Sequence, residues 1–245
     1  MLNLITPNWP APDNISAFTT TRLDGYSQPP YDSFNLAMHV GDDTATVARN
    51  RMLLKEQLQL ANEPKWLNQI HGIQVIQADT AQINATADAS FTRQPQIACA
   101  ILTGDCLPLL ICDRAGSIVA AVHAGWKGLA AGIIEATLTA LSVPTKDLLV
   151  WLGPAIGPEA FEVGEEVYQQ FIAFDPQALF AFKRNANNRW LADLYTLAKQ
   201  RLNAQGVTQI FGGNLCTYTD EQRFYSYRKK NPTGRMASLI WLNNP

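Results

Sequence analysis

Short apolar runs separated by polar, glycine-marked turns dominate the middle of the chain, from residue 98 to residue 128. Residues 107–112 and 117–122 are two such runs, and the polar loop between them, 113–116, ends in glycine. Two apolar runs joined by a loop of this kind predict an antiparallel β-hairpin. We therefore expect a hairpin at the centre of the fold.

The hairpin brings a thiol and an imidazole together. If Cys112 faces Ser117 across the loop, the same register places Cys106 opposite His123. Facing side chains in a ladder have Cβ atoms roughly 4.5–5.5 Å apart. That separation suits two ligands of one metal ion, and it equally suits a thiol beside a base.

Elsewhere the hydrophobic pattern predicts strands and helices that do not alternate regularly. The expected strands are 14–20, 73–77, 147–152, 208–211 and 236–242, and the expected helices are 43–60, 128–141, 165–174 and 190–204. Residues 79–95 look polar and irregular. With an antiparallel central hairpin, this mixture favours an α+β fold with mixed sheets over a doubly wound parallel fold. We expect residues 1–245 to form a single domain.

Composition narrows the class of protein. The 245 residues are 47% hydrophobic and 16% charged, which is typical of a globular chain. The net charge of −2 gives no reason to expect a nucleic-acid partner or a membrane surface as partner. No apolar run reaches the roughly 18–20 residues that span a bilayer, and the N-terminus lacks the pattern of a secretory signal.

We therefore expect a cytoplasmic protein with reduced thiols. Four cysteines are too few for a disulfide scaffold. Cys99 and Cys112 lie within apolar runs, where a cysteine is ordinarily inert core packing. Cys106 follows a turn, where packing explains it less well. The sequence has neither a GxGxxG nor a P-loop motif, which argues against dinucleotide and Walker-type sites.

The histidines suggest how the thiol is used. Only His39 and His71 exist besides His123, and His71 precedes an expected strand at a glycine-marked turn. A His71–Cys106–His123 set would suit a catalytic zinc, which takes three protein ligands and keeps a fourth position open. Thiolate favours zinc or copper(I) over magnesium. Two alternatives stay open: a metal-free pair in which Cys106 attacks an acyl carbon with His123 as base, and a buried thiol packed beside a histidine.

Two basic features suggest an anionic substrate. The expected helix after His123 begins at Gly125–Gly128, where free backbone N–H groups and Lys127 would attract an anion. The last loop carries the second feature, a cluster that runs from Arg228 to Arg235. Arginine suits bidentate phosphate contacts better than lysine does.

At these residues the chain strongly resembles the YfiH family, a laccase-domain family once called multicopper polyphenol oxidases and later described as purine nucleoside phosphorylases. The resemblance rests on motifs along nearly the whole chain: TTR at 20–22, FNLAMHVGDD at 34–43, WLNQIHG at 66–72, ADAS at 87–90, TGDCLPLL at 103–110, VHAGWKG at 122–128, WLGPAIGP at 151–158, FEVGEEV at 161–167, GGNLCTY at 212–218 and FYSYR at 224–228. The chain departs from the family at two positions, with Gly104 where alanine is frequent and Lys127 where arginine is frequent.

The resemblance implies a four-layer α/β/β/α fold and one zinc ion held by His71, Cys106 and His123. It implies phosphorolysis of adenosine, guanosine, inosine and methylthioadenosine, with adenosine deamination at the same protein. A further activity proposed for the family is removal of a wrongly added amino acid from a peptidoglycan precursor, which here would use Cys106 and His123. The expected partners are small molecules, a purine nucleoside and phosphate, and the expected assembly is a monomer or a weak homo-oligomer.

The older oxidase activity needs a blue copper site and a trinuclear cluster as well, far more histidine ligands than three. We reject multicopper chemistry and keep copper only as an alternative metal for the same trio. For the expected reactions, Asp105 is the first candidate acid or base, because it adjoins Cys106. The candidate substrate-binding residues are Arg22, Asn35, Lys127 and Arg228.

Overall fold

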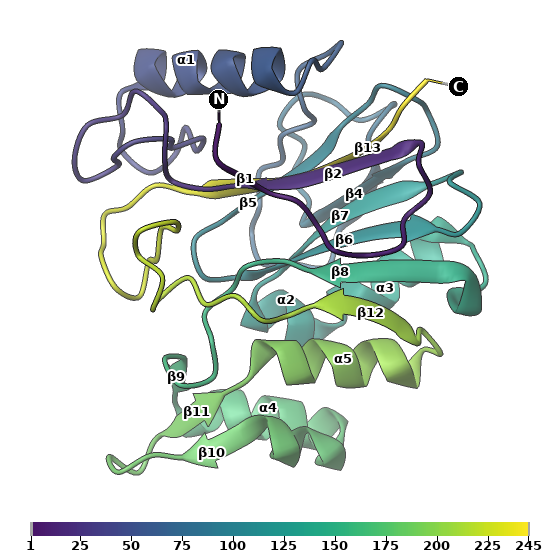
Figure 1. Cartoon of the computed structure of the whole chain (residues 1–245). Helices are drawn as coiled ribbons and strands as arrows, with labels where there is room; N and C mark the ends of the chain where they lie inside the picture. The colour runs from purple at the N-terminus through teal and green to yellow at the C-terminus, as the bar shows by residue number, and fades with distance from the viewer. Residues whose placement is uncertain (1, 245) are drawn as a thin grey trace.

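Two β-sheets lie face to face, with helices on both outer sides (Figure 1). The computed structural model describes residues 2–244. One sheet has four antiparallel strands in the order β1 (Leu4–Ile5), β2 (Ile15–Thr20), β13 (Met236–Leu242) and β5 (Cys99–Thr103). Helix α1 (Thr44–Gln57) covers its outer face (Figure 1).

The second sheet is mixed and has six strands. Their order is β12 (Gln209–Gly212), β8 (Leu148–Leu152), β6 (Leu107–Asp113), β7 (Val119–Ala124), β4 (Ala89–Thr92) and β3 (Val75–Gln77). The outer pairs β12–β8 and β3–β4 are parallel, and the pairs between them are antiparallel. Its outer face carries three helices: α2 (Trp126–Ala131), α3 (Ile133–Leu141) and α5 (Leu194–Ala204). The predicted four-layer α/β/β/α fold with mixed sheets is therefore confirmed.

Smaller elements complete the chain beside α5. Helix α4 (Glu165–Phe174) packs against a three-stranded sheet, β10 (Phe182–Arg184), β11 (Trp190–Ala192) and β9 (Glu162–Val163). Two short 3₁₀ helices, η1 (Thr145–Asp147) and η2 (Pro176–Ala181), link the larger elements. No helix of residues 2–244 is long and apolar enough to cross a membrane.

Apolar side chains fill the space between each pair of layers. Ile101 and Ile240 of the smaller sheet pack against Leu110 and Ala121 of the larger sheet. The helices α2, α3 and α5 bury the other face of the larger sheet. Because β6 and β7 are covered on both faces, all of their residues are buried, and apart from Asp113 and His123 both strands are apolar.

The central hairpin is confirmed, but its predicted register is wrong by two residues. Cys112 pairs with Val119 instead of Ser117, and Pro108 pairs with His123. The loop is longer because the Asp113 carboxylate accepts hydrogen bonds from the backbone N–H groups of Ser117 and Ile118, at 2.7 and 3.2 Å. A slip of two residues keeps every side chain on its face of the sheet, so Cys106 and His123 still converge.

Three other expectations need correction. The helix predicted over 190–204 is strand β11 followed by α5, because Asp193 caps α5 by accepting from Tyr195 and Thr196. The helix predicted over 128–141 is two helices, broken at Gly132, whose φ of 106° is left-handed. Strand β4 lies inside 79–95, and its four residues pair with β7. The predictions over 165–174 and 236–242 are confirmed to the residue.

Candidate metal centre and substrate cavity

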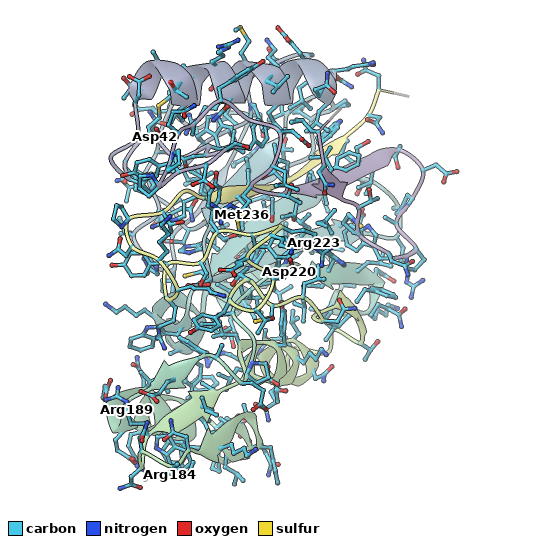
Figure 2. The ribbon with its side chains drawn as sticks, turned by 60° about the vertical axis from the view of Figure 1, so that its left-hand side comes forward. Asp42, Arg184, Arg189, Asp220, Arg223 and Met236 are labelled. Atoms are coloured by element: carbon cyan, nitrogen blue, oxygen red, sulfur yellow. The ribbon has the colours of Figure 1, made fainter. Side chains whose placement is uncertain are left out.

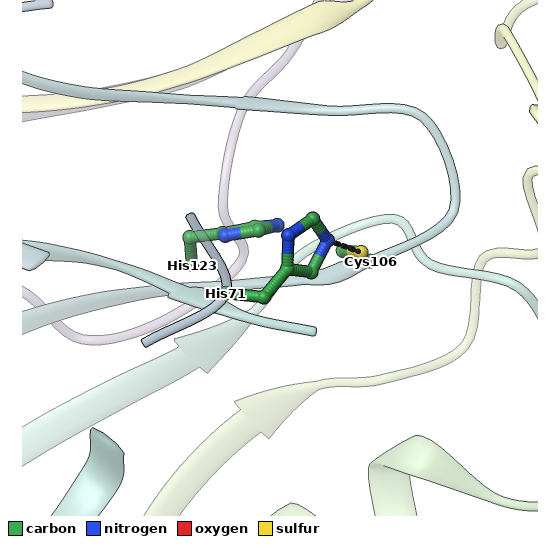
Figure 3. A group of neighbouring side chains, drawn as sticks. All are labelled: His71, Cys106 and His123. Carbon is green, nitrogen blue, oxygen red and sulfur yellow. Dashed lines mark hydrogen bonds between the residues drawn. The ribbon is translucent and has the colours of Figure 1, made fainter. Parts of the chain in front are cut away.

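Three side chains from separate parts of the chain converge at one end of the central hairpin (Figure 3). His71 lies in the turn before β3, Cys106 directly precedes β6, and His123 lies in β7. Their potential ligand atoms all fall within 4.8 Å of one another. The Cys106 Sγ is 3.6 Å from His71 Nε2, and the centres of the His71 and His123 rings are 4.7 Å apart.

Asp88, which the sequence reasoning left inside an irregular segment, holds both histidines. Its fully buried carboxylate bonds to His123 Nδ1 at 2.8 Å and accepts from the backbone N–H groups of His71 and Gly72, at 2.9 and 2.7 Å. Burial would raise the pKa of Asp88, but these hydrogen bonds outweigh it and lower that pKa. The contact fixes the ring of His123 so that Nε2 is the nitrogen available to Cys106 or to a metal ion.

Two glycines explain why the backbone after β7 has room for this cluster. A Cβ on Gly125 would lie 2.7 Å from His71 Cδ2 and 3.0 Å from Cys106 Sγ. A Cβ on Gly128 would lie 2.8 Å from the backbone oxygen of Gly72. These glycines therefore allow other parts of the protein, His71, Cys106 and Gly72, to pack against the backbone of this segment. The sequence suggested instead that they allow an anion to approach.

The thiol and the buried imidazole stabilise each other's charged forms. Burial alone would raise the pKa of Cys106, yet the charge and hydrogen bonding of His123 and then His71 lower it. Burial would likewise lower the pKa of His123, but the Cys106 and Asp88 charges raise it. Thiolate is the form of cysteine that binds metals.

The donor set fits a zinc ion. A thiolate and two imidazoles are zinc ligands, and a set of three leaves a fourth position for water or substrate. The Asp88–His123 contact is the carboxylate–histidine arrangement that orients metal-binding imidazoles. These features favour a catalytic over a structural metal, because structural sites use four protein ligands.

The cluster opens into a cavity of about 480 Å³, a volume within the range of small-molecule sites. Aromatic side chains of Trp126, Phe161 and Tyr227 form part of its wall. Outside the cluster, its other polar and charged lining residues are His39, Gln69, Thr103, Asp105, Lys127, Arg228 and Arg235. The structure therefore joins the candidate metal ligands to a mixed aromatic and cationic pocket.

Two of the expected substrate-binding residues, Lys127 and Arg228, line this cavity. Lys127 follows Trp126 at the start of α2, and its Nζ lies 5.7 Å from the centre of the indole ring. Arg228 is exposed, and its Nη1 donates a hydrogen bond of 2.8 Å to the backbone oxygen of Glu162. Neither cation forms an ion pair with a carboxylate of residues 2–244, so both can meet an anion at the cavity mouth.

Asp105, the expected acid or base, lies between the cluster and the loop of Arg228. One carboxylate oxygen accepts from the Thr217 hydroxyl and the other from the backbone N–H of Arg228, both at 2.7 Å. Burial raises the pKa of Asp105 above its ordinary value despite these bonds. Its φ of 119° is strained for a residue with a side chain, as is frequent at functional sites.

The structure does not bring Arg22 and Asn35 to the cavity. Arg22 is tied to Asp32 by an ion pair of 2.8 Å and donates to the backbone oxygen of Glu221, so it joins the first and last loops of the chain. Asn35 is fully buried and donates to Asp42 at 2.9 Å. Both residues are used within the protein, which their loop positions in the sequence could not reveal.

Asp88 and Arg235 are the site residues that the sequence reasoning missed. Asp88 stands within the ADAS motif, so the motif was a usable signal for it. Arg235 was visible only as part of a basic loop in which Arg228 also lines the cavity but Lys229 and Lys230 do not. The spacing of these cations along the sequence does not indicate which of them line the cavity.

Known proteins resemble this chain over nearly its full length. A family model described as multi-copper polyphenol oxidoreductase laccase matches residues 16–243. A protein of Pseudomonas aeruginosa named purine nucleoside phosphorylase is 54% identical over 241 residues, which cover 98% of each chain. Escherichia coli YfiH, also named purine nucleoside phosphorylase, is 49% identical over 99% of this chain and 100% of its own.

Solved structures agree with the fold. A crystal structure of a Neisseria meningitidis protein superposes with a TM-score of 0.95 at 46% identity and covers 99% of this chain and 100% of that one. YlmD from Geobacillus stearothermophilus gives a TM-score of 0.87 at 28% identity, with 95% and 93% covered.

Proposed function

The chain belongs to the multi-copper polyphenol oxidoreductase laccase family, and from this premise we propose that it is a zinc-dependent purine nucleoside phosphorylase. The observation that carries the proposal is the cavity that joins His71, Cys106 and His123 to Lys127 and Arg228. Relatives named purine nucleoside phosphorylase at 47–54% identity support the reaction class.

Phosphorolysis needs an anion held beside a nucleoside, and the cavity offers both environments. A phosphate oxygen attacks C1′ of the ribose, the bond from C1′ to the purine nitrogen breaks, and its electron pair leaves with the base. Lys127 and Arg228 hold the phosphate at the mouth of the cavity. Trp126, Phe161 and Tyr227 offer aromatic faces to the purine.

Asp105 is placed to manage the proton of the departing base. Its raised pKa keeps a larger share of the carboxyl protonated at neutral pH than an ordinary aspartate has, so it can donate to a purine nitrogen. His71, Cys106 and His123 would hold the zinc ion, which when bound supplies a Lewis acid at its open position. Asp88 keeps the His123 ring in the orientation that this requires.

The same residues support adenosine deamination as a second activity of the site. Deamination needs water and a proton donor at the purine C6 position, and Asp105 lines the cavity that would receive this ring. The family's alternative reaction, hydrolysis of a wrongly added amino acid from UDP-muramic acid, would use Cys106 and His123. Copper in the place of zinc, with polyphenol oxidation, is the third alternative.

Incubation with inosine and phosphate tests the proposal. We expect phosphate-dependent release of hypoxanthine and ribose 1-phosphate, which chromatography measures. Cys106→Ala should lose this activity. Cys112→Ala is the matched control, because it removes a thiol from the core of β6 outside the cavity.

Other substrates separate the alternatives. Ammonia released from adenosine without phosphate would show the deaminase activity. Release of serine from UDP-muramoyl-serine, with no hypoxanthine from inosine, would overturn the phosphorylase proposal in favour of precursor editing. Oxygen uptake with a phenol and copper would favour the oxidase.

A further inference from the structure

Arg235 reaches the cavity because the residue beside it, directly after the end of the neighbouring strand β5, is glycine. Strands β13 and β5 pair Met236 with Thr103, so the next position of this register places Arg235 against Gly104. A Cβ on Gly104 would lie 3.0 Å from Arg235 Cδ and 3.3 Å from the backbone oxygen of Gly234. The stem of Arg235 therefore lies over the bare backbone of Gly104 and leads into the cavity wall.

The guanidinium of Arg235 is only partly used by the protein. Its Nη1 donates to the backbone oxygens of Thr233 and Gly234, both at 2.9 Å. Within residues 2–244, Nε and Nη2 donate to no protein acceptor, and no carboxylate forms an ion pair with this arginine. The Nε–Nη2 edge presents two parallel N–H groups, the geometry that binds an oxyanion through two bonds.

Several other arginines of the chain are instead paired with carboxylates. Arg184 and Arg189 meet carboxylates at 2.9 Å near the small sheet, far from Met236 in Figure 2, and Arg223 bonds to Asp220. Arg235 instead carries its charge in a cavity, where burial lowers its pKa. The charges of Cys106 and Asp105 oppose this shift, but within residues 2–244 no carboxylate pairs directly with the guanidinium, so an anion from outside would stabilise it further.

The backbone of Arg235 is held by a buried side chain. Its N–H donates to the side-chain oxygen of buried Asn35 at 3.0 Å, and Asn35 is itself fixed by Asp42. Its guanidinium carbon also lies 5.6 Å from the centre of the Tyr227 ring. Asn35, expected from the sequence to touch substrate, thus acts as a positioning residue for Arg235.

We propose that Arg235 binds the phosphate co-substrate through its Nε–Nη2 edge, and that Gly104 provides the space for its side chain. The inference rests on the proposed phosphorylase function and assigns the residue that binds its phosphate. Lys127 offers a single point charge, and Arg228 is exposed. Arg235, in contrast, is half-buried and its stem lies over Gly104, so its fork is the better positioned to fix a phosphate. The cations at the mouth attract the anion, and Arg235 fixes its orientation.

Steady-state kinetics with phosphate and inosine varied separately test this role. Arg235→Gln should raise the KM for phosphate about 10- to 100-fold, with a change in the KM for inosine of less than about threefold. Arg235→Lys should recover only part of the loss, because it keeps the charge but not the fork. Lys229→Gln is the control, since Lys229 pairs with Glu221 outside the cavity.

Gly104→Ala tests the same role without removing the charge, and it serves if Arg235→Gln does not fold. We expect it to raise the KM for phosphate, because the added methyl group displaces Arg235. Circular dichroism must show that each variant is folded. A phosphate KM unchanged in folded Arg235→Gln would overturn the inference and leave the phosphorylase function standing.

Binding of inorganic phosphate alone separates the two proposals. Phosphate titrated into the protein as isolated, followed by ³¹P NMR line broadening, should bind the parent chain and bind Arg235→Gln at least about 10-fold more weakly. If the parent protein has no phosphorolytic activity but shows this difference, the function proposal fails while the anion site stands. If phosphate binds both proteins equally, the anion site is overturned.

Discussion

At the scale of single residues, Asp88 decides the geometry of the candidate metal centre. One carboxylate orients the His123 ring and, through backbone N–H groups, fixes the turn that carries His71, whose φ of 62° is left-handed. A residue in that conformation needs such support, because its backbone is otherwise strained. The ligand set therefore depends on a fourth side chain that binds no metal itself.

Replacement of that carboxylate should weaken the metal site. Asp88→Asn should lower zinc affinity about 10- to 100-fold, the usual cost of losing a partner that orients a ligand histidine. Competition with a chromophoric chelator measures the affinity, and elemental analysis should give about one zinc per chain for the parent protein. Asp79→Asn is the control, since the side chain of Asp79 bonds to Gln77 and Thr92, away from the cluster. Equal zinc affinity in parent and Asp88→Asn would refute the role.

Arg22 should affect stability and leave catalysis unchanged. Its guanidinium ties Asp32 to the last loop of the chain and lies 4.9 Å from the centre of the Tyr225 ring. Arg22→Ala should lower the free energy of unfolding by about 1–3 kcal/mol, measured in urea. The KM for phosphate should stay the same, and exposed Arg114→Ala should change neither quantity. A raised phosphate KM with unchanged stability would return Arg22 to the substrate site.

At the scale of elements, two glycines at the ends of α2 have opposite reasons for being glycine. Gly125 has ordinary extended backbone, φ −62° and ψ 154°, but no room for a side chain beside His71 and Cys106. Gly132 has a left-handed φ of 106°, but the nearest atom to a Cβ there would be 3.5 Å away. The first glycine serves the site, and the second serves the break between α2 and α3.

Paired alanine substitutions should separate these roles. Gly125→Ala should disturb zinc binding, seen as a changed visible spectrum of the cobalt-substituted protein, with little change in the unfolding midpoint. Gly132→Ala should lower stability by about 1–2 kcal/mol, because alanine resists the left-handed conformation, with an unchanged cobalt spectrum. If Gly125→Ala bound cobalt normally, the contacts with His71 and Cys106 would not control the site.

The elements also show how far the sequence could be interpreted. Helix 165–174 and strand 236–242 were predictable because each has a clear period or a continuous apolar run with marked ends. The hairpin register was not, because Asp113 lengthens the loop by binding Ser117 and Ile118 through side-chain contacts that have no periodicity. The residues of 190–192 have apolar character that suits either a helix or a strand, and pairing with β9 decides it.

At the scale of the whole molecule, the site depends on pairing between distant segments. Strand β13, near the C-terminus, lies between β2 and β5, so it brings Arg235 beside Gly104 (Figure 1). The motifs allowed the His71–Cys106–His123 trio to be proposed before the structure, because these residues stand in short stretches of distinctive sequence. The wall of the cavity could not be assembled in this way, since Arg235 and Phe161 face it only through tertiary packing.

The four cysteines divide between the interior of the fold and its cavity or surface. Cys99 and Cys112 are fully buried between layers, and burial raises the pKa of each thiol to about 12. Cys106 is partly exposed at the candidate metal centre. Cys216 is partly exposed as well, and hydrogen bonds from Thr219 and Gly157 lower its pKa although burial opposes this. Reactivity toward an alkylating agent should follow this division, because thiolate is the reactive form.

Iodoacetamide labelling followed by peptide mass spectrometry tests the division and the metal site together. A raised pKa lowers the thiolate fraction at any given pH, so Cys99 and Cys112 should stay unlabelled between pH 7 and 9 in the folded protein and become labelled in urea. In chelator-treated protein, Cys106 and Cys216 should both react. Added zinc should then protect Cys106 at least about 10-fold while Cys216 reacts as before, because a metal-bound thiolate is no longer a free nucleophile. Protection of Cys216 to the same extent would mean that zinc acts on the whole molecule, and unchanged labelling of Cys106 would remove it from the ligand set.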